Sequence, residues 1–519
     1  MNVSVREAVF ALLRDFGLTT IFGNPGSTEL PMFRDFPADF RYVLGLQESV
    51  VVAMADGFAQ ARGRAAFVNL HSAIGVGHAL GSIFTAYRNE TPLVVTAGQQ
   101  ARSLLPFEPF LYSEQATNLP RPYVKWSCEP ARAADVPAAI ARAYYTAMQS
   151  PRGPTFVSVP VDDWERACTP LPAREVSGTI SGDPALLARA ATLLASARRP
   201  VLVVGAAVAR DGAWPELLAL AERHQAAVWV SPLCARNNFP ERHRLFAGFL
   251  PADRARIVAC LAGSDLVVVL GAPVFTYHVE GDGPHLPEGA TLVQLTQDPA
   301  AAARAPVGLA IVTDLKLGIR ALLASGAPAR AAPAVAPRAS PLAPDRLTEP
   351  YLMQQLAALR PAGSIVVEEA PGSRGAMHAY LPMLEPDTFY TCASGGLGYG
   401  LPAAVGVALA RPERRVIALL GDGSAMYAIQ GLWSAAELAL PVTFVIVNNG
   451  SYRALNEFAA HFGLATPPGT LLPHLDFCAL ARAQGVEAVR VTRCAELDAA
   501  LRMAFGTTRA VLVEVCVEE

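Results

Sequence analysis

Short, nearly continuous apolar runs recur along the chain, and each is bounded by glycine or polar residues. Examples are 200–205 (PVLVVG), 265–271 (DLVVVLG), 415–420 (RVIALL) and 442–447 (VTFVIV). Runs of this length without polar alternation are typical of strands buried on both faces of a parallel sheet. Segments of helical length, such as the amphipathic stretch Val5–Phe16, separate the runs. The pattern predicts an α/β fold of doubly wound parallel sheets.

The runs fall into three blocks, which suits a chain of 519 residues. We expect an N-terminal domain at 1–175, a central Rossmann-like domain at 182–325 and a C-terminal domain at 345–519. The segment 326–344 (GAPARAAPAVAPRASPLAP) is rich in alanine and proline. Proline removes backbone donors and blocks helix formation, so this segment is expected to be an exposed linker. No GxGxxG follows a strand of the central block, so neither a flavin nor a nicotinamide is expected there.

The stretch 421–449 (GDGSAMYAIQGLWSAAELALPVTFVIVNN) combines two of these runs with a glycine-rich turn. It predicts a strand, a turn, one helix that begins near Ser424, and a second strand that ends in Asn448-Asn449. Gly421 and Gly423 let the backbone approach a bulky anion, and the free N–H groups of a helix start favour one. The carboxyl ends of parallel strands are where such sheets bind ligands.

Asp422 and Asn449 follow neighbouring strands, so both side chains are expected at the same edge of the sheet. Two such oxygen donors plus a diphosphate suit Mg²⁺, which prefers octahedral oxygen coordination. Each fragment alone also fits a plain tight turn. The pair, GDG at 421–423 and NN at 448–449, resembles the motif of thiamine diphosphate enzymes. The resemblance implies that Asp422, Asn449 and the carbonyl of Ser451 bind Mg²⁺, or Ca²⁺ in its place.

Long segments away from this motif narrow the resemblance. They include IFGNPGSTELP, LGLQESVVVAMADGFAQA, FVNLHSA, NLPRPYVKWS, GAPVFTYH and GGLGYGLPAAVGVALARPERRVIALLGDGSA. Together they resemble the benzoylformate decarboxylase family over essentially the whole chain. The resemblance implies thiamine diphosphate as cofactor and the non-oxidative decarboxylation of an aryl 2-oxo acid to an aldehyde and CO₂. The absence of a His-His pair argues against the pyruvate-type decarboxylases.

Family roles carry over to four catalytic positions. Glu48, at the start of an expected helix, corresponds to the acid that activates the cofactor, although a glutamate there also suits the helix dipole. A partly buried carboxyl has a raised pKa and can pass a proton near neutral pH. Ser27 is similar to the serine that binds the substrate carboxylate. His71 and His278 resemble the two histidines that move protons, a task suited to imidazole.

The remaining site positions also come from the resemblance. Leu397 matches the apolar residue that keeps the cofactor bent, which brings its reacting groups together. Pro371 and Thr391 depart from the family, since they replace a residue of a Ser/Thr-rich segment and a phenylalanine of the aryl pocket. The other expected cofactor contacts are Gly372, Gly395, Gly421, Gly423, Ser424 and Tyr452. The expected pocket residues are Phe110, Leu111, Pro371, Thr391, Ala454, Leu455 and Phe458.

Two alternatives remain open. A carboligase, acetolactate synthase-like or hydroxyketone-forming, shares the steps up to the carbanion and then adds it to a second aldehyde or oxo acid. A non-catalytic binding or regulatory relative is disfavoured, because Glu48, His71, His278, Asp422 and Asn449 are all present. In the family Glu48 and the GDG…NN motif of one site come from different subunits, so a dimer at least, and usually a tetramer, is expected.

Composition restricts the partners and the location. The formal net charge is −3, charged residues make up 17% of the chain, and no basic run stands out. We therefore expect no nucleic-acid partner. No uncharged apolar stretch reaches 18 residues, so no membrane span is expected. The eight cysteines show no CxxC spacing, and no secretory signal opens the sequence. The expected location is the cytoplasm.

Overall fold

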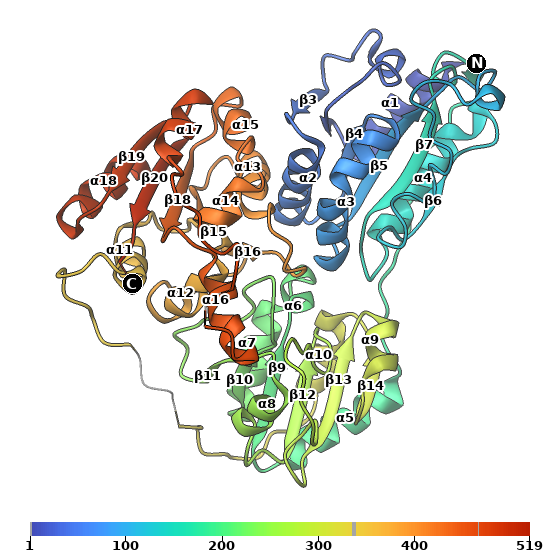
Figure 1. Cartoon of the computed structure of the whole chain (residues 1–519). Coiled ribbons are helices and arrows are strands. Elements are labelled where there is room, and N and C mark those ends of the chain that lie inside the picture. The colour runs from blue at the N-terminus through green and yellow to red at the C-terminus, as the bar shows by residue number, and fades with distance from the viewer. Residues whose placement is uncertain (1–2, 335–338, 466, 519) are drawn as a thin grey trace. The chain divides into compact units, whose positions relative to one another are not determined.

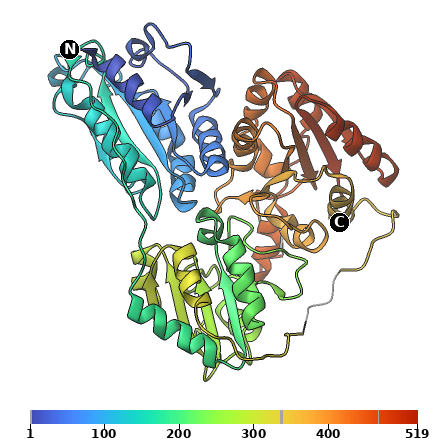
Figure 2. The ribbon, with the colours of Figure 1, turned by 180° about the vertical axis from the view of Figure 1, so that it is seen from behind.

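The computed structural model of the chain describes residues 3–334, 339–465 and 467–518. Three six-stranded parallel sheets with flanking helices make up most of it. Figures 1 and 2 show how the helices lie along the sheets. The predicted fold class is therefore confirmed. Two compact units divide the chain: unit 1 contains residues 1–176, 342–375 and 392–519, and unit 2 contains residues 177–341 and 376–391. Residues 335–338 of the expected linker lie outside the described residues.

The N-terminal sheet of unit 1 brings three strand ends to one edge. Gly23 pairs with both Leu44 and Asn69, so the segments after these residues start side by side. The strand order is β3 (Arg41–Leu44), β2 (Thr20–Gly23), β4 (Ala66–Leu70), β5 (Leu93–Gln99), β7 (Thr155–Pro160) and β6 (Ser127–Cys128). The longer helices are α1 (Val5–Asp15), α2 (Glu48–Arg62), α3 (Ser72–Arg88) and α4 (Val136–Met148). A two-stranded sheet joins β1 (Val3–Ser4) to β8 (Ala167–Cys168).

The C-terminal sheet contains the GDG and NN motifs. Gly421, the last residue of its third strand, pairs with Val447 of the next strand. The strand order is β16 (Phe389–Thr391), β15 (Ile365–Glu369), β17 (Val416–Gly421), β18 (Val442–Asn448), β20 (Val511–Cys516) and β19 (Glu487–Val491). Its α-helices are α11 (Glu349–Leu359), α12 (Arg374–Tyr380), α13 (Gly400–Ala410), α14 (Asp422–Met426), α15 (Gly431–Glu437), α16 (Arg453–Ala459), α17 (Phe477–Ala483) and α18 (Cys494–Gly506).

The prediction of one helix beginning near Ser424 is wrong. The connection between β17 and β18 contains two short helices, α14 and α15, and α14 already begins at Asp422. Between them the backbone makes i→i+3 hydrogen bonds, for example from the N–H of Gly431 to the carbonyl of Ala428. Such bonds tighten the turn and interrupt a regular α-helix. Gly431 is also needed for packing, because a Cβ there would lie 2.5 Å from Leu401 Cδ2 of α13.

Helices α2 and α13 pack against each other through glycine. A Cβ on Gly57 of α2 would overlap the carbonyl oxygen of Ala403, and one on Gly406 of α13 would overlap the carbonyl oxygen of Met54. Glycine removes this obstacle and lets the two backbones approach closely. The N-terminal and C-terminal parts of unit 1 are thereby joined where Met54 and Gly57 of α2 meet Ala403 and Gly406 of α13.

Unit 2 contains the central sheet, and its two faces explain the unbroken apolar runs. Leu202 and Val268 belong to one buried cluster, whereas Val203 and Val267 belong to another. The strand order is β11 (Phe246–Phe249), β10 (Ala227–Val230), β9 (Pro200–Val204), β12 (Leu266–Leu270), β13 (Thr291–Thr296) and β14 (Leu309–Val312). Its helices are α5 (Pro184–Ser196), α6 (Ala207–Arg210), α7 (Trp214–His224), α8 (Arg254–Cys260), α9 (Pro299–Arg304) and α10 (Leu315–Leu323). Among the described residues, no helix is long and apolar enough to cross a membrane.

Candidate active site

The GDG and NN motifs meet at the carboxyl edge of the C-terminal sheet. Asp422 is buried, and its carboxylate accepts hydrogen bonds from the N–H of Gly423 at 2.7 Å and from the N–H of Asn449 at 3.2 Å. The Asn449 side-chain oxygen accepts one from the N–H of Ser451 at 3.0 Å. Burial raises the pKa of the Asp422 carboxyl, because the charged form loses solvation. The structure therefore brings all three predicted metal ligands together.

This donor set fits a divalent cation. A carboxylate, a side-chain amide and a main-chain carbonyl are hard oxygen ligands of the kind that Mg²⁺ and Ca²⁺ bind. A nearby cation would also offset the cost of burying the Asp422 charge. Gly423 and Tyr452 lie close together at this edge, because a Cβ on Gly423 would overlap the Tyr452 ring. Ser424 is buried one residue further along α14.

A buried glutamate supports the turn that contains Leu397. Glu369 ends β15, and its carboxylate accepts hydrogen bonds from the N–H of Gly398 at 2.6 Å and from the N–H of Gly400. Gly395 and Gly398 both have positive φ, which glycine adopts without strain. Burial raises the pKa of Glu369 to about 8. This role was not predicted from the sequence, in which the signal is a carboxylate at a strand end.

The segment that departs from the family lies beside α16. Pro371 begins a 3₁₀ turn, Pro371–Ser373, and the Arg453 guanidinium donates a hydrogen bond to the carbonyl of Gly372. A Cβ on Gly372 would lie 3.4 Å from the N atom of Ala454. The expected residues Pro371, Gly372 and Ala454 are thus neighbours. Leu455 is half exposed, and the Phe458 ring stacks on His461.

Glu48 starts α2, as the sequence predicts. The side-chain oxygen of Gln47 accepts hydrogen bonds from the N–H groups of Ser49 and Val50 and so caps the helix. Glu48 is 9% exposed, and its Oε2 lies 3.0 Å from Nδ1 of His78. This contact with His78 could not be predicted from the sequence, because the two residues are 30 positions apart.

His71 lies at the junction of β4 and α3. It is the N-cap residue of α3, and the next residue, Ser72, has φ of +46°, which is uncommon for a residue with a side chain. Ser27 is exposed in the turn after β2, where a Cβ on its neighbour Gly26 would overlap the His71 ring. The structure therefore places the His71 ring against the turn that contains Ser27.

A further buried carboxylate, Glu29, orients His71. Its Oε2 lies 2.8 Å from His71 Nδ1 and accepts a hydrogen bond from the N–H of Gly26 at 2.8 Å. Its Oε1 accepts from the Thr28 hydroxyl at 2.7 Å and from the N–H of Gly98 at 2.9 Å. Glu29 is 1% exposed. Glu29 was not among the predicted site residues, although its position within the segment GNPGSTELP was a usable signal.

His278 and Thr391 belong to unit 2. His278 is exposed in the loop that follows β12, and its backbone N–H donates to the carbonyl of Ala252 at 2.8 Å. Thr391 is 2% exposed at the end of β16, and its N–H donates to the carbonyl of Ala235 at 3.0 Å. Their assignment to the site stays a prediction.

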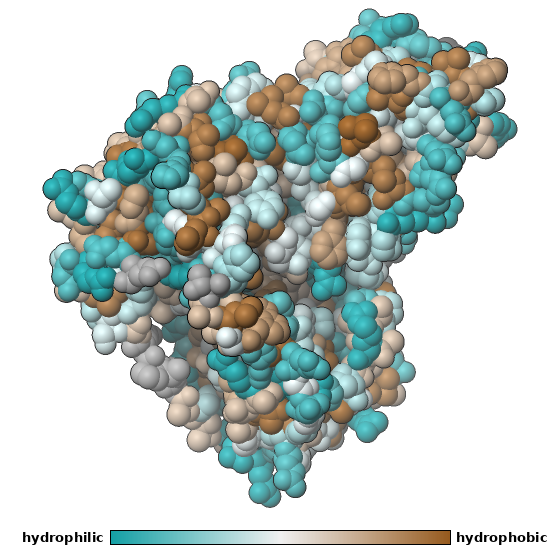
Figure 3. Space-filling view, viewed as in Figure 1, coloured by the Kyte–Doolittle hydropathy of each residue, from teal (hydrophilic) through white to brown (hydrophobic). Residues whose placement is uncertain are grey.

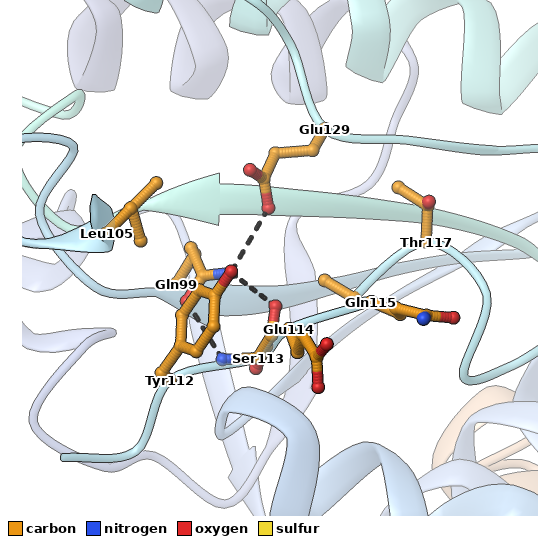
Figure 4. Close-up of a pocket in the computed structure, with 9 residues that line it drawn as sticks. Gln99, Leu105, Tyr112, Ser113, Glu114, Gln115, Thr117 and Glu129 are labelled. Carbon is orange, nitrogen blue, oxygen red and sulfur yellow. Dashed lines mark hydrogen bonds between the residues drawn. The ribbon is translucent and has the colours of Figure 1, made fainter. Parts of the chain in front are cut away.

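The loop that contains Phe110 and Leu111 is attached to the end of β5. The Gln99 side chain donates a hydrogen bond to the backbone carbonyl of Ser113 at 2.8 Å and accepts one from the backbone N–H of Ser113 at 3.2 Å, as Figure 4 shows. Gln99, Ser113 and Glu129 line a polar cavity of about 140 Å³ behind the loop. Phe110 itself is 88% exposed. The loop is thus fixed at its base, while its apolar tip faces outward.

Comparison with protein families accounts for this arrangement. The models of the thiamine pyrophosphate enzymes match residues 3–117 with the N-terminal TPP-binding domain, 187–322 with the central domain and 372–515 with the C-terminal TPP-binding domain. The chain belongs to the thiamine pyrophosphate enzyme family. Its cofactor is therefore thiamine diphosphate with a divalent metal, in agreement with the oxygen ligands at Asp422 and Asn449.

Individual relatives match over their full length. Benzoylformate decarboxylase of Pseudomonas aeruginosa is 48% identical over 99% of this chain and 98% of its own. The solved 4-hydroxybenzoylformate decarboxylase of Rhodococcus jostii RHA1 has a TM-score of 0.96 and 41% identity, with 99% of each chain covered. Benzoylformate decarboxylase of Polynucleobacter necessarius has a TM-score of 0.96 and 40% identity, again with 99% coverage of both. The resemblance inferred from the sequence is confirmed.

Proposed function

We propose that this enzyme decarboxylates benzoylformate or a ring-substituted benzoylformate to the aldehyde and CO₂ without oxidation. The full-length identity of 48% to a benzoylformate decarboxylase carries this proposal. The proximity of Asp422, Asn449 and Ser451 supports it, since decarboxylation needs a bound cofactor. The pairs Glu29–His71 and Glu48–His78 support it as well, since the reaction needs groups that move protons.

In this proposal the C-terminal domain binds the cofactor. Asp422, Asn449 and the carbonyl of Ser451 hold Mg²⁺ (or Ca²⁺), which in turn binds the diphosphate. When bound, thiamine diphosphate would supply the electron sink that decarboxylation requires. Leu397 would support the bound cofactor. The remaining cofactor contacts are assigned to Gly372, Gly395, Gly421, Gly423, Ser424 and Tyr452.

Residues of the N-terminal and central domains are proposed to move protons and to orient the substrate. Glu48 holds a proton at its carboxyl group for the ring of the cofactor, and the Ser27 hydroxyl donates a hydrogen bond to the substrate carboxylate. His71, oriented by Glu29, and His278 donate and accept protons at the reacting atoms. A neutral imidazole has one donor and one acceptor nitrogen, so each histidine can serve both directions of transfer.

The substrate ring is proposed to lie among Phe110, Leu111, Pro371, Thr391, Ala454, Leu455 and Phe458. Thr391 stands where the family has a phenylalanine in its aryl pocket. Threonine is smaller than phenylalanine and adds a hydroxyl group. It therefore gives room and a hydrogen-bonding group to a ring that has a polar substituent. The 4-hydroxybenzoylformate decarboxylase of Rhodococcus jostii RHA1 is the relative that suggests such a substrate.

We further propose a homodimer, assembled into a tetramer, with active sites at the dimer interface. Large apolar side chains are exposed on α16 and just after it, at Leu455, Phe462 and Leu464. Figure 3 shows a brown, hydrophobic cluster in the region of α16. Apolar surface of this kind favours an interface. The domain boundaries 1–175, 182–325 and 345–519, with a linker at 326–344, remain part of the proposal, as does a cytoplasmic location, which the eight free cysteines support.

The test is CO₂ release from benzoylformate by the purified protein with thiamine diphosphate and Mg²⁺, compared with Glu48→Gln. We expect rapid release by the unchanged protein and a loss of at least about 100-fold in the variant, since general acid–base groups contribute about that much. Equal rates would refute the role of Glu48. A hydroxyketone as the main product would instead identify a carboligase.

A further inference from the structure

The turn that contains Leu397 is held at both ends by side chains from the N-terminal part of unit 1. At one end, the side-chain oxygen of Asn89 accepts a hydrogen bond from the N–H of Ala393 at 2.8 Å. At the other end, the side-chain NH₂ group of Gln60 donates one to the Tyr399 hydroxyl at 2.9 Å. Asn89 lies directly after α3, and Gln60 belongs to α2. The position of this Leu397 turn therefore depends on how the two amides are oriented.

One buried carboxylate orients both amides. Asp56 of α2 accepts a hydrogen bond from Gln60 on Oδ1 at 2.8 Å and from Asn89 on Oδ2 at 3.0 Å. The Thr91 hydroxyl donates to Oδ1 at 2.6 Å. Because an ionised carboxylate only accepts hydrogen bonds, it turns the NH₂ group of Asn89 toward itself and leaves the amide oxygen for Ala393. Asp56 is 0% exposed, and its three partners are buried as well. These contacts are formed within one chain, so they do not depend on which surfaces a second copy covers.

We propose that Asp56 is a positioning residue for the Leu397 turn. By orienting the two amides it holds Ala393 and Tyr399, and so fixes Leu397 between them. Glu369, at the end of β15, holds the same turn from the C-terminal sheet. Without Asp56 the two amides can turn, which loosens the hold on Leu397. The proposal rests on the proposed role of Leu397 as a support for the bound cofactor.

The test is the affinity of the full-length protein, freed of cofactor, for thiamine diphosphate, measured by calorimetric titration at a fixed Mg²⁺ concentration. Asp56→Ala removes both carboxylate oxygens, and we expect the Kd to rise about 10-fold or more, as the loss of a buried hydrogen bond predicts. Asp56→Asn keeps an oxygen for Asn89, so we expect a Kd within about 3-fold of that of the unchanged protein. The matched control is Thr155→Val, which removes hydroxyl hydrogen bonds to the carbonyls of Leu93 at 3.2 Å and Ala143 at 3.1 Å. It should lower the free energy of unfolding and leave the Kd unchanged.

A second comparison separates positioning from a general loss of stability. Leu397→Ala is expected to weaken cofactor binding by itself. If Asp56 acts by positioning Leu397, then Asp56→Ala should have little further effect in the Leu397→Ala protein, because the side chain that it positions is already absent. Two independent effects would instead combine as the product of the two fold-changes.

The outcomes separate this inference from the function on which it rests. Normal affinity in Asp56→Ala, or fold-changes that multiply in the double variant, would overturn the role of Asp56 and leave that of Leu397. If Asp56→Ala does not fold, Asn89→Ala combined with Tyr399→Phe releases both ends of the turn while Asp56 stays in place. Normal affinity of that protein would overturn the role of Asp56 in the same way. Normal affinity in Leu397→Ala would instead overturn the proposed role of Leu397 itself.

Discussion

The contact between Glu29 and His71 gives the sharpest test of how the site is built. The change Glu29→Gln keeps the shape of the side chain but turns one carboxylate oxygen into an NH₂ group. If the amide oxygen replaces Oε1, it still accepts from Thr28 and Gly98. The NH₂ group then faces the N–H of Gly26 and His71 Nδ1, both of which Oε2 contacts at 2.8 Å.

The cost follows from these contacts. The N–H of Gly26 loses its acceptor, and an unsatisfied buried donor costs about 1–3 kcal/mol. The hydrogen bonds that remain are no longer made to a charged carboxylate. Hydrogen bonds with an ionised partner are about twice as strong as neutral ones, so these bonds become weaker. We therefore expect the free energy of unfolding to fall by about 2–4 kcal/mol. His71 must also change its tautomer, because Nδ1 now meets a donor. We expect kcat/KM to fall about 10- to 100-fold, where each factor of ten corresponds to about 1.4 kcal/mol.

The assay combines denaturant unfolding with CO₂ release from benzoylformate. Asp265→Asn is the matched control, because the Asp265 carboxylate in unit 2 accepts from the N–H groups of Arg198 at 2.6 Å and Arg199 at 2.9 Å. It is expected to lower stability while leaving kcat/KM unchanged. If Glu29→Gln also lowers stability but keeps normal kcat/KM, the carboxylate does not orient a catalytic histidine and the reasoning fails.

Three further predictions address the cofactor, the substrate and the fold. Asp422→Ala should release the metal and thiamine diphosphate on gel filtration; full occupancy would refute the metal site. Thr391→Phe should raise the preference for benzoylformate over 4-hydroxybenzoylformate in competition, and an unchanged ratio would place residue 391 outside the pocket. Gly406→Ala should lower the free energy of unfolding by about 1–3 kcal/mol, because the methyl group overlaps the Met54 carbonyl. The control is Gly81→Ala in α3, where a Cβ meets open space, and it should leave the free energy of unfolding unchanged. Equal stability of the Gly406→Ala and Gly81→Ala variants would contradict the close packing of α2 on α13.

The strands, and the proximity of Asp422 to Asn449, could be predicted because each depends on local sequence and strand order. A run such as 265–271 is apolar throughout because its strand packs on both faces, with Val268 in one cluster and Val267 in the other. Asp422 and Asn449 directly follow two neighbouring parallel strands, so their positions follow from topology.

The supporting contacts could not be predicted, because their partners are distant in sequence. Glu29 and His71 are 42 residues apart, and Glu48 and His78 are 30 apart. Each pair depends on the final position of α3, which local patterns do not determine. The break between α14 and α15 was missed for the same reason, because Gly431 packs against Leu401 of a different helix.

The most direct test of the central claim is a panel of 2-oxo acids supplied to the purified protein with thiamine diphosphate and Mg²⁺. The panel contains benzoylformate, 4-hydroxybenzoylformate, pyruvate and a branched aliphatic 2-oxo acid, and mass spectrometry identifies the products. We predict the highest kcat/KM for one of the two aryl acids, with the corresponding benzaldehyde as the product. Faster turnover of pyruvate or the branched acid, or no CO₂ release from any of the four, would contradict the assignment as an aryl 2-oxo acid decarboxylase.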